Sequence, residues 1–227
     1  MSGATARRSG RQDSARPRPA DDGADHEALN GVLEEARRLG FIGPSSIDEQ
    51  LAHSRRFGRA LHEGWTVEAP VVCDLGAGGG LPSLPIAVEY PRLQLVLVDA
   101  SRRRTGFLVW ATVELGLSAR AEVWCGRAED FGHDPARRHA FDAVVARAFG
   151  GPAMTLECAA PLLAADGRCL ISEPPEGRRW PSEAVAALGL AQRPTLDGFA
   201  RFDRVGEVPA MYPRPARHQQ RTPLFDL

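Results

Sequence analysis

Five short apolar segments recur between residues 71 and 172, and they limit the folds open to this chain more than any other feature. Each segment is continuously apolar rather than alternating, which is typical of strands buried on both faces and so of a parallel sheet. Because segments with helical spacing separate them, we predict a doubly wound, mostly parallel α/β sheet. The five segments are VVCDL (71–75), LQLVLVD (93–99), AEVWC (121–125), DAVVA (142–146) and RCLIS (168–172).

Two amphipathic helices are predicted ahead of the sheet. The first starts near Asp25, a candidate N-cap, and stops before Gly40. The second begins at Ser46, whose S-x-x-E relation to Glu49 is a capping box. We therefore divide the chain into a disordered Arg-rich tail, a helical extension and a sheet domain, which cover residues 1–24, 25–69 and 70–227.

Helices and a hairpin are predicted within the sheet domain. Residues 101–117 form the clearest helix, with Ser101 as its cap. Residues 152–165 form another, which the Asp166-Gly167 turn is expected to end. The segment 192–208 is compatible with an antiparallel hairpin at the edge of the sheet.

Composition places the chain among ordinary globular proteins, with 43% hydrophobic and 25% charged residues. No apolar run approaches the roughly 18 residues of a membrane span, and no apolar segment follows the N-terminal arginines. We therefore expect a cytoplasmic protein without a membrane partner. The sequence does not define its oligomeric state. The cysteines have no CxxC pair, so we expect no metal site and interpret them as small buried hydrophobes: Cys73, Cys125, Cys158 and Cys169.

The formal net charge of -1 combines a basic start with an acidic body. Residues 1–20 carry five Arg and one Asp, a net charge of +4, which leaves -5 for the remainder. A basic tail of this kind can contact nucleic acid, or it can be a solvated chain end. Both interpretations stay open at this stage.

The most informative motif is the glycine-rich stretch DLGAGGGLPSLPIAV at residues 74–88, directly after the first predicted strand. Gly76, Gly78 and Gly80 alternate with other residues, and a loop with so few Cβ atoms lets the backbone approach a ligand closely. Such loops bind dinucleotides, phosphates or S-adenosylmethionine (SAM). Leu81 stands where the third glycine of G-x-G-x-x-G would be, which disfavours a nicotinamide dinucleotide.

Acidic residues follow three consecutive predicted strands. Asp74 would repel a pyrophosphate but suits the cationic amino group of a methionine moiety. Asp99 ends the second strand and is placed to accept hydrogen bonds from ribose hydroxyls. Glu129 and Asp130 follow the third strand, where an adenine edge would lie. The sequence therefore predicts a SAM site at the carboxyl edge of the sheet, against the alternative of a packing loop with solvated acids.

Four segments resemble the family of small-subunit ribosomal RNA guanine-N7 methyltransferases, also called glucose-inhibited division protein B. The similarity runs from about Val71 to Leu224, and the segments are DLGAGGGLPSLPIA (74–87) with its G-x-P-x-x-P continuation, VDASRRRTGFL (98–108), FDAVVARAF (141–149) and YPRPARHQQRTPL (212–224). The resemblance implies a Rossmann-like class I SAM-dependent methyltransferase acting on ribosomal RNA or the small ribosomal subunit.

The resemblance also implies site residues. SAM contacts are implied at Gly76, Leu81, Ala128, Glu129 and Arg147, and the physical argument adds Asp74, Gly78, Gly80 and Asp99. Arg147 can fix the methionine carboxylate or bind a substrate phosphate; the alternative is a surface ion pair with Glu129 or Asp142. RNA contacts are implied for Arg103, Arg104 and Arg214 within a larger set of candidates, which also holds Arg102, Arg217 and Arg221. No catalytic base is assigned, because guanine N7 carries a free lone pair and its methylation needs alignment rather than deprotonation.

The chain departs from the family's pattern on the acceptor side. The family's Asn-Leu-Thr stretch is absent, and Arg56 stands in the acidic position of a His-x-x-Asp element that begins at His53. Glu173-Pro174 replaces a Lys-Gly pair that faces RNA, and an anion there weakens attraction to phosphate. Three functions therefore stay open: the rRNA methyltransferase, a SAM-dependent methyltransferase of a small molecule, and a SAM-binding regulator without transfer activity.

Overall fold

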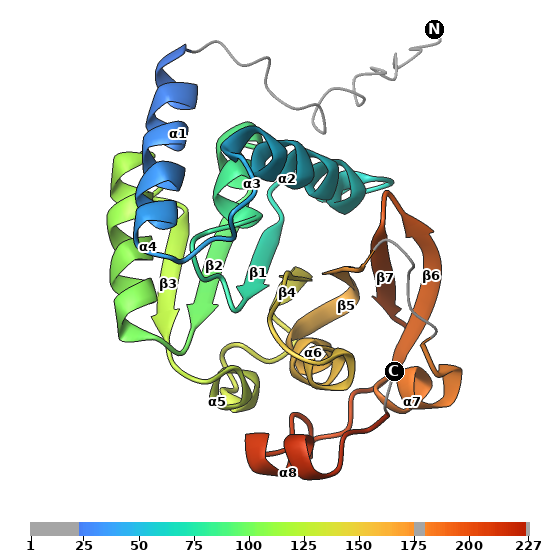
Figure 1. Cartoon of the computed structure of the whole chain (residues 1–227). Coiled ribbons are helices and arrows are strands. Elements are labelled where there is room, and N and C mark those ends of the chain that lie inside the picture. The colour runs from blue at the N-terminus through green and yellow to red at the C-terminus, as the bar shows by residue number, and fades with distance from the viewer. Residues whose placement is uncertain (1–22, 175–179, 226–227) are drawn as a thin grey trace, which may run out of the picture.

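The computed structural model describes residues 23–174 and 180–225, and a seven-stranded sheet forms its centre (Figure 1). The strand order is β3-β2-β1-β4-β5-β7-β6. Neighbours among β1 to β5 pair in parallel, whereas β7 is antiparallel to β5 and β6 is antiparallel to β7. The predicted mostly parallel α/β sheet is confirmed. The strands are β1 (Val71–Leu75), β2 (Gln94–Asp99), β3 (Ala121–Cys125), β4 (Phe141–Ala146), β5 (Leu163–Ser172), β6 (Leu190–Leu196) and β7 (Phe199–Arg204).

Both faces of the parallel part are buried, which explains the continuously apolar strand sequences. On β1, Val72 belongs to the hydrophobic core on one face, and Cys73 belongs to the core on the other. On β4, Val145 and Val144 divide in the same way. Helices α3 (Ser83–Glu89) and α4 (Arg102–Glu114) cover the first face, and α5 (Ala128–His133) and α6 (Pro152–Ala159) cover the second.

The predicted helix over residues 152–165 is wrong in its last part. The α-helix ends at Ala159, a 3-10 turn follows over Ala160–Leu162, and the chain then enters β5. Pro161 has no N–H to extend the helix. Asp166 adopts a φ of 60° inside β5, so the Asp166-Gly167 pair bends a strand and does not stop a helix.

The two N-terminal helices, α1 (Gly23–Arg38) and α2 (Ile47–His62), share the core of the α3 and α4 face. The predicted capping box is confirmed, because the Glu49 N–H donates to Ser46 Oγ at 3.2 Å and the Ser46 N–H donates to Glu49 Oε2 at 2.9 Å. Asp25 lies in the first turn of α1 and does not cap it, since the helix begins two residues earlier. Of the predicted tail, residues 1–22 lie outside the described residues.

The remaining predicted elements hold with small shifts. Ser101 caps α4, and the hairpin of β6 and β7 turns at Asp197 and Gly198 with φ values of 52° and 82°, the positive pair of a two-residue hairpin turn. Three cysteines are buried as predicted, but Cys125 is exposed because it ends the edge strand β3. Helices α7 (Ser182–Ala187) and α8 (Ala216–Arg221) complete the fold, and α8 lies below α5 and α6 in Figure 1.

Candidate functional site

The candidate site lies where the strand order reverses. β2 and β3 lie on one side of β1, and β4 and β5 lie on the other. In open α/β sheets, ligands bind outside the carboxyl ends of the strands beside such a reversal. The predicted residues Asp74, Asp99, Glu129 and Arg147 all sit at or directly after the carboxyl ends of β1 to β4, so the fold brings them to one rim.

Asp99 anchors the glycine loop to the end of β2. Its Oδ2 accepts a hydrogen bond from the Gly78 N–H at 3.1 Å, and its Oδ1 accepts one from the Ser101 N–H at 2.8 Å. Arg104 Nη1 lies 3.5 Å from the same Oδ2, and the carboxylate is only 4% exposed. Asp99 was predicted to accept hydrogen bonds from ribose hydroxyls, and in the structure it also positions the glycine loop. Oδ1 accepts only the Ser101 N–H and keeps a second lone pair, so the ribose contact stays a prediction.

Two of the loop glycines are required by space as well as by conformation. Gly76 has a φ of 72°, and a Cβ there would lie 2.7 Å from Phe149 Cδ2. Gly80 has a φ of 85°, and its Cβ would lie 2.2 Å from Leu84 Cδ1. Gly78 differs, because a Cβ there would meet no atom closer than 3.6 Å. Its φ of 55° requires a glycine for conformation, since a Cβ there would make only ordinary contacts with the Gly76 and Phe41 carbonyl oxygens.

Asp74 is a buried carboxylate that lacks a full set of partners. The residue is only 1% exposed, and its Oδ2 has no hydrogen-bond partner among the described residues. Burial raises the pKa of Asp74 to about 7; the nearby Ser83 hydroxyl opposes the rise most, although it makes no well-formed hydrogen bond, the Asp99 carboxylate adds to the rise, and Arg147 opposes it. An unsatisfied buried acceptor is costly, and a cationic or hydroxylic donor would satisfy it. The residues present therefore fit the ammonium end of SAM, held directly or through water.

Leu81 packs away from the rim. Its side chain is 7% exposed and belongs to a small core between α1 and α2, which contains Leu29, Leu33, Ile47 and Leu51. Any cofactor contact at this position must therefore use the backbone.

Ala128 and Glu129 open α5, directly after β3. Ala128 is buried, and the Glu129 side chain is 9% exposed with Arg127 Nη2 at 3.3 Å from its Oε1. Asp130 is exposed. Glu129 is thus placed at the rim as predicted, and its contact with an adenine edge stays a prediction.

Arg147 follows β4 and reaches toward α2. Its Nη2 donates to Gln50 Oε1, whereas its Nη1 is buried and has no partner among the described residues. Burial lowers the pKa of Arg147, and the Asp74 carboxylate offsets part of that effect. The acids of the alternative ion pair are engaged elsewhere, since Asp142 accepts the Val71 N–H at 2.8 Å and Glu129 pairs with Arg127.

Gln50 is a functional candidate that the sequence analysis missed. It is 3% exposed, on the face of α2 that also buries Ile47 and Leu51. A glutamine within an apolar helical stripe was the available signal, because a buried carboxamide needs hydrogen-bond partners.

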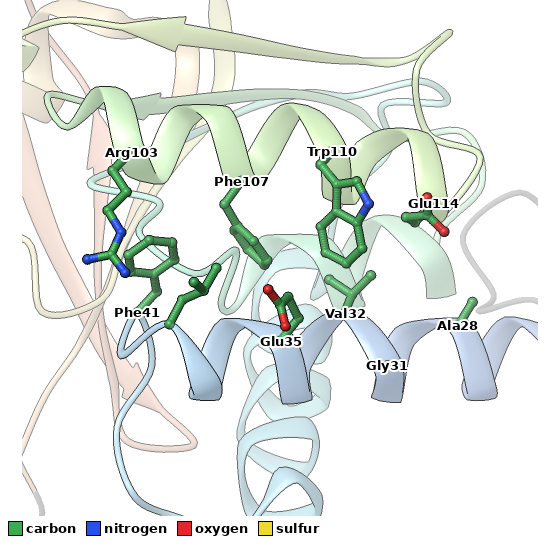
Figure 2. Close-up of a pocket in the computed structure, with 10 residues that line it drawn as sticks. Ala28, Gly31, Val32, Glu35, Phe41, Arg103, Phe107, Trp110 and Glu114 are labelled. Carbon is green, nitrogen blue, oxygen red and sulfur yellow. The ribbon is translucent and has the colours of Figure 1, made fainter.

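The three predicted RNA contacts have different surroundings. The Arg103 guanidinium lies over the Phe41 ring, 5.1 Å from its centroid, and points along the space between α1 and α4 (Figure 2). Arg104 pairs with Asp99 and is half exposed. Arg214 is tied to the buried Glu157, with Nε and Nη2 each 2.8 Å from a carboxylate oxygen and its own N–H at 2.7 Å. Arg214 therefore fixes the C-terminal segment to α6, a structural role that the sequence analysis did not predict.

Two cavities flank this part of the molecule. One of about 760 Å³ lies between α1 and α4 and is lined mainly by Val32, Phe41, Phe107 and Trp110 (Figure 2). It lies away from the carboxyl ends of β1 and β4, so we treat it as an interhelical groove. The other, of about 400 Å³, lies against α2 and includes Gln50 and Arg147.

Residues 23–174 and 180–225 contain no group of three or more His, Cys, Asp or Glu side chains that could hold a metal ion. Within the same ranges, every helix is too short or too polar to cross a lipid bilayer.

Comparison with known proteins gives a consistent family. The family model described as rRNA small subunit methyltransferase G matches residues 36–173. Two relatives named ribosomal RNA small subunit methyltransferase G, from Streptococcus pyogenes serotypes M6 and M49, are each 33% identical over 175 residues, which cover 71% of this chain and 73% of the relative.

Solved structures show the same fold at low identity. A methyltransferase from Geobacter sulfurreducens matches with a TM-score of 0.54 and 16% identity, over 83% of this chain and 91% of that one. A SAM-dependent methyltransferase from Aquifex aeolicus matches with a TM-score of 0.52 and 15% identity, over 76% and 97%. These two support the fold, and the family model with the relatives supports the finer assignment. The chain belongs to the rRNA small subunit methyltransferase G family.

Proposed function

We propose that this protein transfers the methyl group of SAM to N7 of a guanine in small-subunit ribosomal RNA, in the cytoplasm. The observation that carries the proposal is the rim formed by Asp74, the Asp99-anchored glycine loop and Arg147 at the reversal of the sheet. Membership of the family and the names of its relatives support the RNA acceptor.

The residues at this rim would hold the cofactor by charge and shape. Asp74 would pair with the ammonium group, and the glycine loop, which has no Cβ atoms at Gly76, Gly78 and Gly80, would let the ligand approach its backbone. Glu129, at the start of α5, would meet the adenine end. When bound, SAM would supply a sulfonium methyl group; the N7 lone pair would bond to its carbon as the C–S bond breaks and S-adenosylhomocysteine leaves, and no proton need be lost.

The contribution of the protein to such a reaction is alignment. Direct transfer between two bound groups gains its rate from proximity and orientation, and the short hydrogen-bonded loop between β1 and α3 is a rigid support for both. The Gly76 and Ala77 N–H groups both donate to the Val98 carbonyl, at 2.8 and 3.0 Å, which fixes the loop to β2.

The acceptor-side substitution at Glu173 has a structural partner. Its Oε1 accepts a hydrogen bond from Trp180 Nε1 at 2.7 Å, which ties the end of β5 to the segment before α7. One oxygen of the carboxylate is thus held within the protein, which gives Glu173 a structural role.

A parallel labelling experiment tests the proposal. Purified protein and tritiated SAM are incubated with small ribosomal subunits from a strain without the corresponding methyltransferase, with free rRNA, and with a metabolite extract. We expect label in the small-subunit RNA and 7-methylguanosine by nucleoside mass spectrometry. Label confined to the metabolite extract would replace the RNA acceptor by a small molecule. SAM binding without any labelled product would leave only a regulator.

A further inference from the structure

The cavity of about 400 Å³ between α2 and Arg147 is walled largely by polar side chains. Gln50, His53 and Arg56 line it from α2, and Arg147 lines it from the end of β4. Glu49, the acid on its wall, is engaged in the capping box at the start of α2. The cavity therefore adjoins the proposed cofactor site through Arg147, on the side of the sheet reversal that the N-terminal helices cover.

Two guanidinium groups in this cavity, those of Arg56 and Arg147, form no ion pair with another described residue. Among the ion pairs of the described residues, neither Arg56 nor Arg147 has an acid within 4 Å. The pKa of His53 is lowered to about 4, mainly by burial and further by the charges of Arg147 and Arg56. The His53 ring is therefore neutral at physiological pH, and the positive charge of the cavity comes from the two arginines. Arg147 is influenced by the Asp74 carboxylate, but neither arginine has an acid in direct contact among the described residues, and such a pair is suited to an oxyanion.

Two buried polar nitrogen atoms in the same wall also lack partners among the described residues. Arg147 Nη1 and His53 Nδ1 are buried nitrogen atoms without a hydrogen-bond partner among the described residues. The other nitrogen of each side chain is held: Arg147 Nη2 by Gln50 Oε1, and His53 Nε2 by Ser172 Oγ at 3.3 Å. Leaving a buried donor unpaired costs about 1–3 kcal/mol, so a ligand with acceptor oxygens would be stabilised here.

We infer that this cavity binds a phosphate group of the methyl-acceptor strand, held between Arg56 and Arg147 and positioned through Gln50. The inference rests on the proposed function, because the phosphate belongs to the RNA acceptor. The methionine carboxylate of the cofactor is the other oxyanion that Arg147 can reach. Arg56 distinguishes the two, because it lines the cavity from α2, whereas Arg147 also influences the Asp74 carboxylate of the cofactor site.

Arg56→Gln tests the inference, with Arg59→Gln as the matched control. Arg59 is an exposed cation on the same helix that interacts with Glu89 and does not line the cavity. Binding of a fluorescently labelled single-stranded RNA to the protein loaded with S-adenosylhomocysteine is followed by anisotropy over a series of KCl concentrations. We expect Arg56→Gln to weaken binding several-fold at low salt and to reduce the slope of log K against log salt by about 0.7, the value for one phosphate of a single strand. Arg59→Gln and Arg56→Lys should keep the wild-type slope.

Calorimetry of S-adenosylhomocysteine binding supplies the second readout. We expect the same affinity for wild type, Arg56→Gln and Arg59→Gln. An unchanged salt slope in Arg56→Gln, or weaker S-adenosylhomocysteine binding in that variant alone, would overturn the inference. Methylation of small subunits by wild type with no slope change in Arg56→Gln would retain the proposed function and remove the phosphate site. If Arg56→Gln shows the expected slope change but wild type methylates no small subunits, the phosphate site is retained and the proposed function is rejected.

Discussion

Replacement of Asp74 by Asn should make the ligand-free protein more stable at alkaline pH while it weakens cofactor binding. The pKa of Asp74 is about 7 in the fold against 3.8 for an unperturbed aspartate. A carboxyl group with a raised pKa binds its proton more tightly in the folded than in the unfolded state, so the free energy of unfolding falls as pH rises from 3.8 to 7. The full shift corresponds to about 4 kcal/mol at pH 8, of which about 3 kcal/mol is lost above pH 5.

Urea denaturation of wild type and Asp74→Asn at pH 5 and pH 8, without ligand, measures this effect. The stability advantage of the variant should grow by about 3 kcal/mol between the two pH values, because asparagine has the same shape and no charge to bury. In calorimetry at pH 8 the variant should bind SAM about tenfold or more weakly, since it loses the counter-charge to the ammonium group. Asp142→Asn is the control, because Asp142 bonds the Val71 N–H at the start of β1 and should not affect SAM affinity. Parallel pH profiles, or an unchanged affinity in Asp74→Asn, would refute the reasoning.

Three further substitutions probe other parts of the site. Gly80→Ala should lower the melting temperature and the SAM affinity, since the new Cβ would lie 2.2 Å from a leucine methyl and the φ at this position is 85°. The control Gly106→Ala, in the open part of α4, should raise the melting temperature. Equal effects of the two substitutions would contradict this assignment. Glu157→Gln should cost about 3 kcal/mol in urea denaturation, because it leaves the Arg214 charge without its partner; a loss below about 1 kcal/mol would show that the pair is dispensable. His53→Gln should flatten the loss of stability as pH falls from 6.5 toward 4, because the pKa of His53 is lowered to about 4 and the unfolded state binds the proton first. A wild-type pH profile in His53→Gln would rule out that titration.

The sequence determined the fold class, because strand burial on both faces leaves a signature in single segments. Val72 and Cys73 are adjacent in sequence and face opposite cores, so both must be apolar. The capping box of Ser46 and Glu49 is likewise a local arrangement, which a single helix start defines. The rim residues Asp74 and Asp99 were predictable for a related reason, since parallel strands bring their carboxyl ends to one edge whatever the details of packing.

The tertiary structure decided which polar groups are paired and which are not. Arg214 resembles an exposed RNA contact in the sequence, but the fold places it against Glu157, 57 residues away, where a buried acid requires a cation. The link between Arg147 and Gln50 spans 97 residues, and no local pattern relates them. Strand periodicity and helix caps act over a few residues and can be read from the chain, whereas the partner of a buried charge depends on the packing of distant elements.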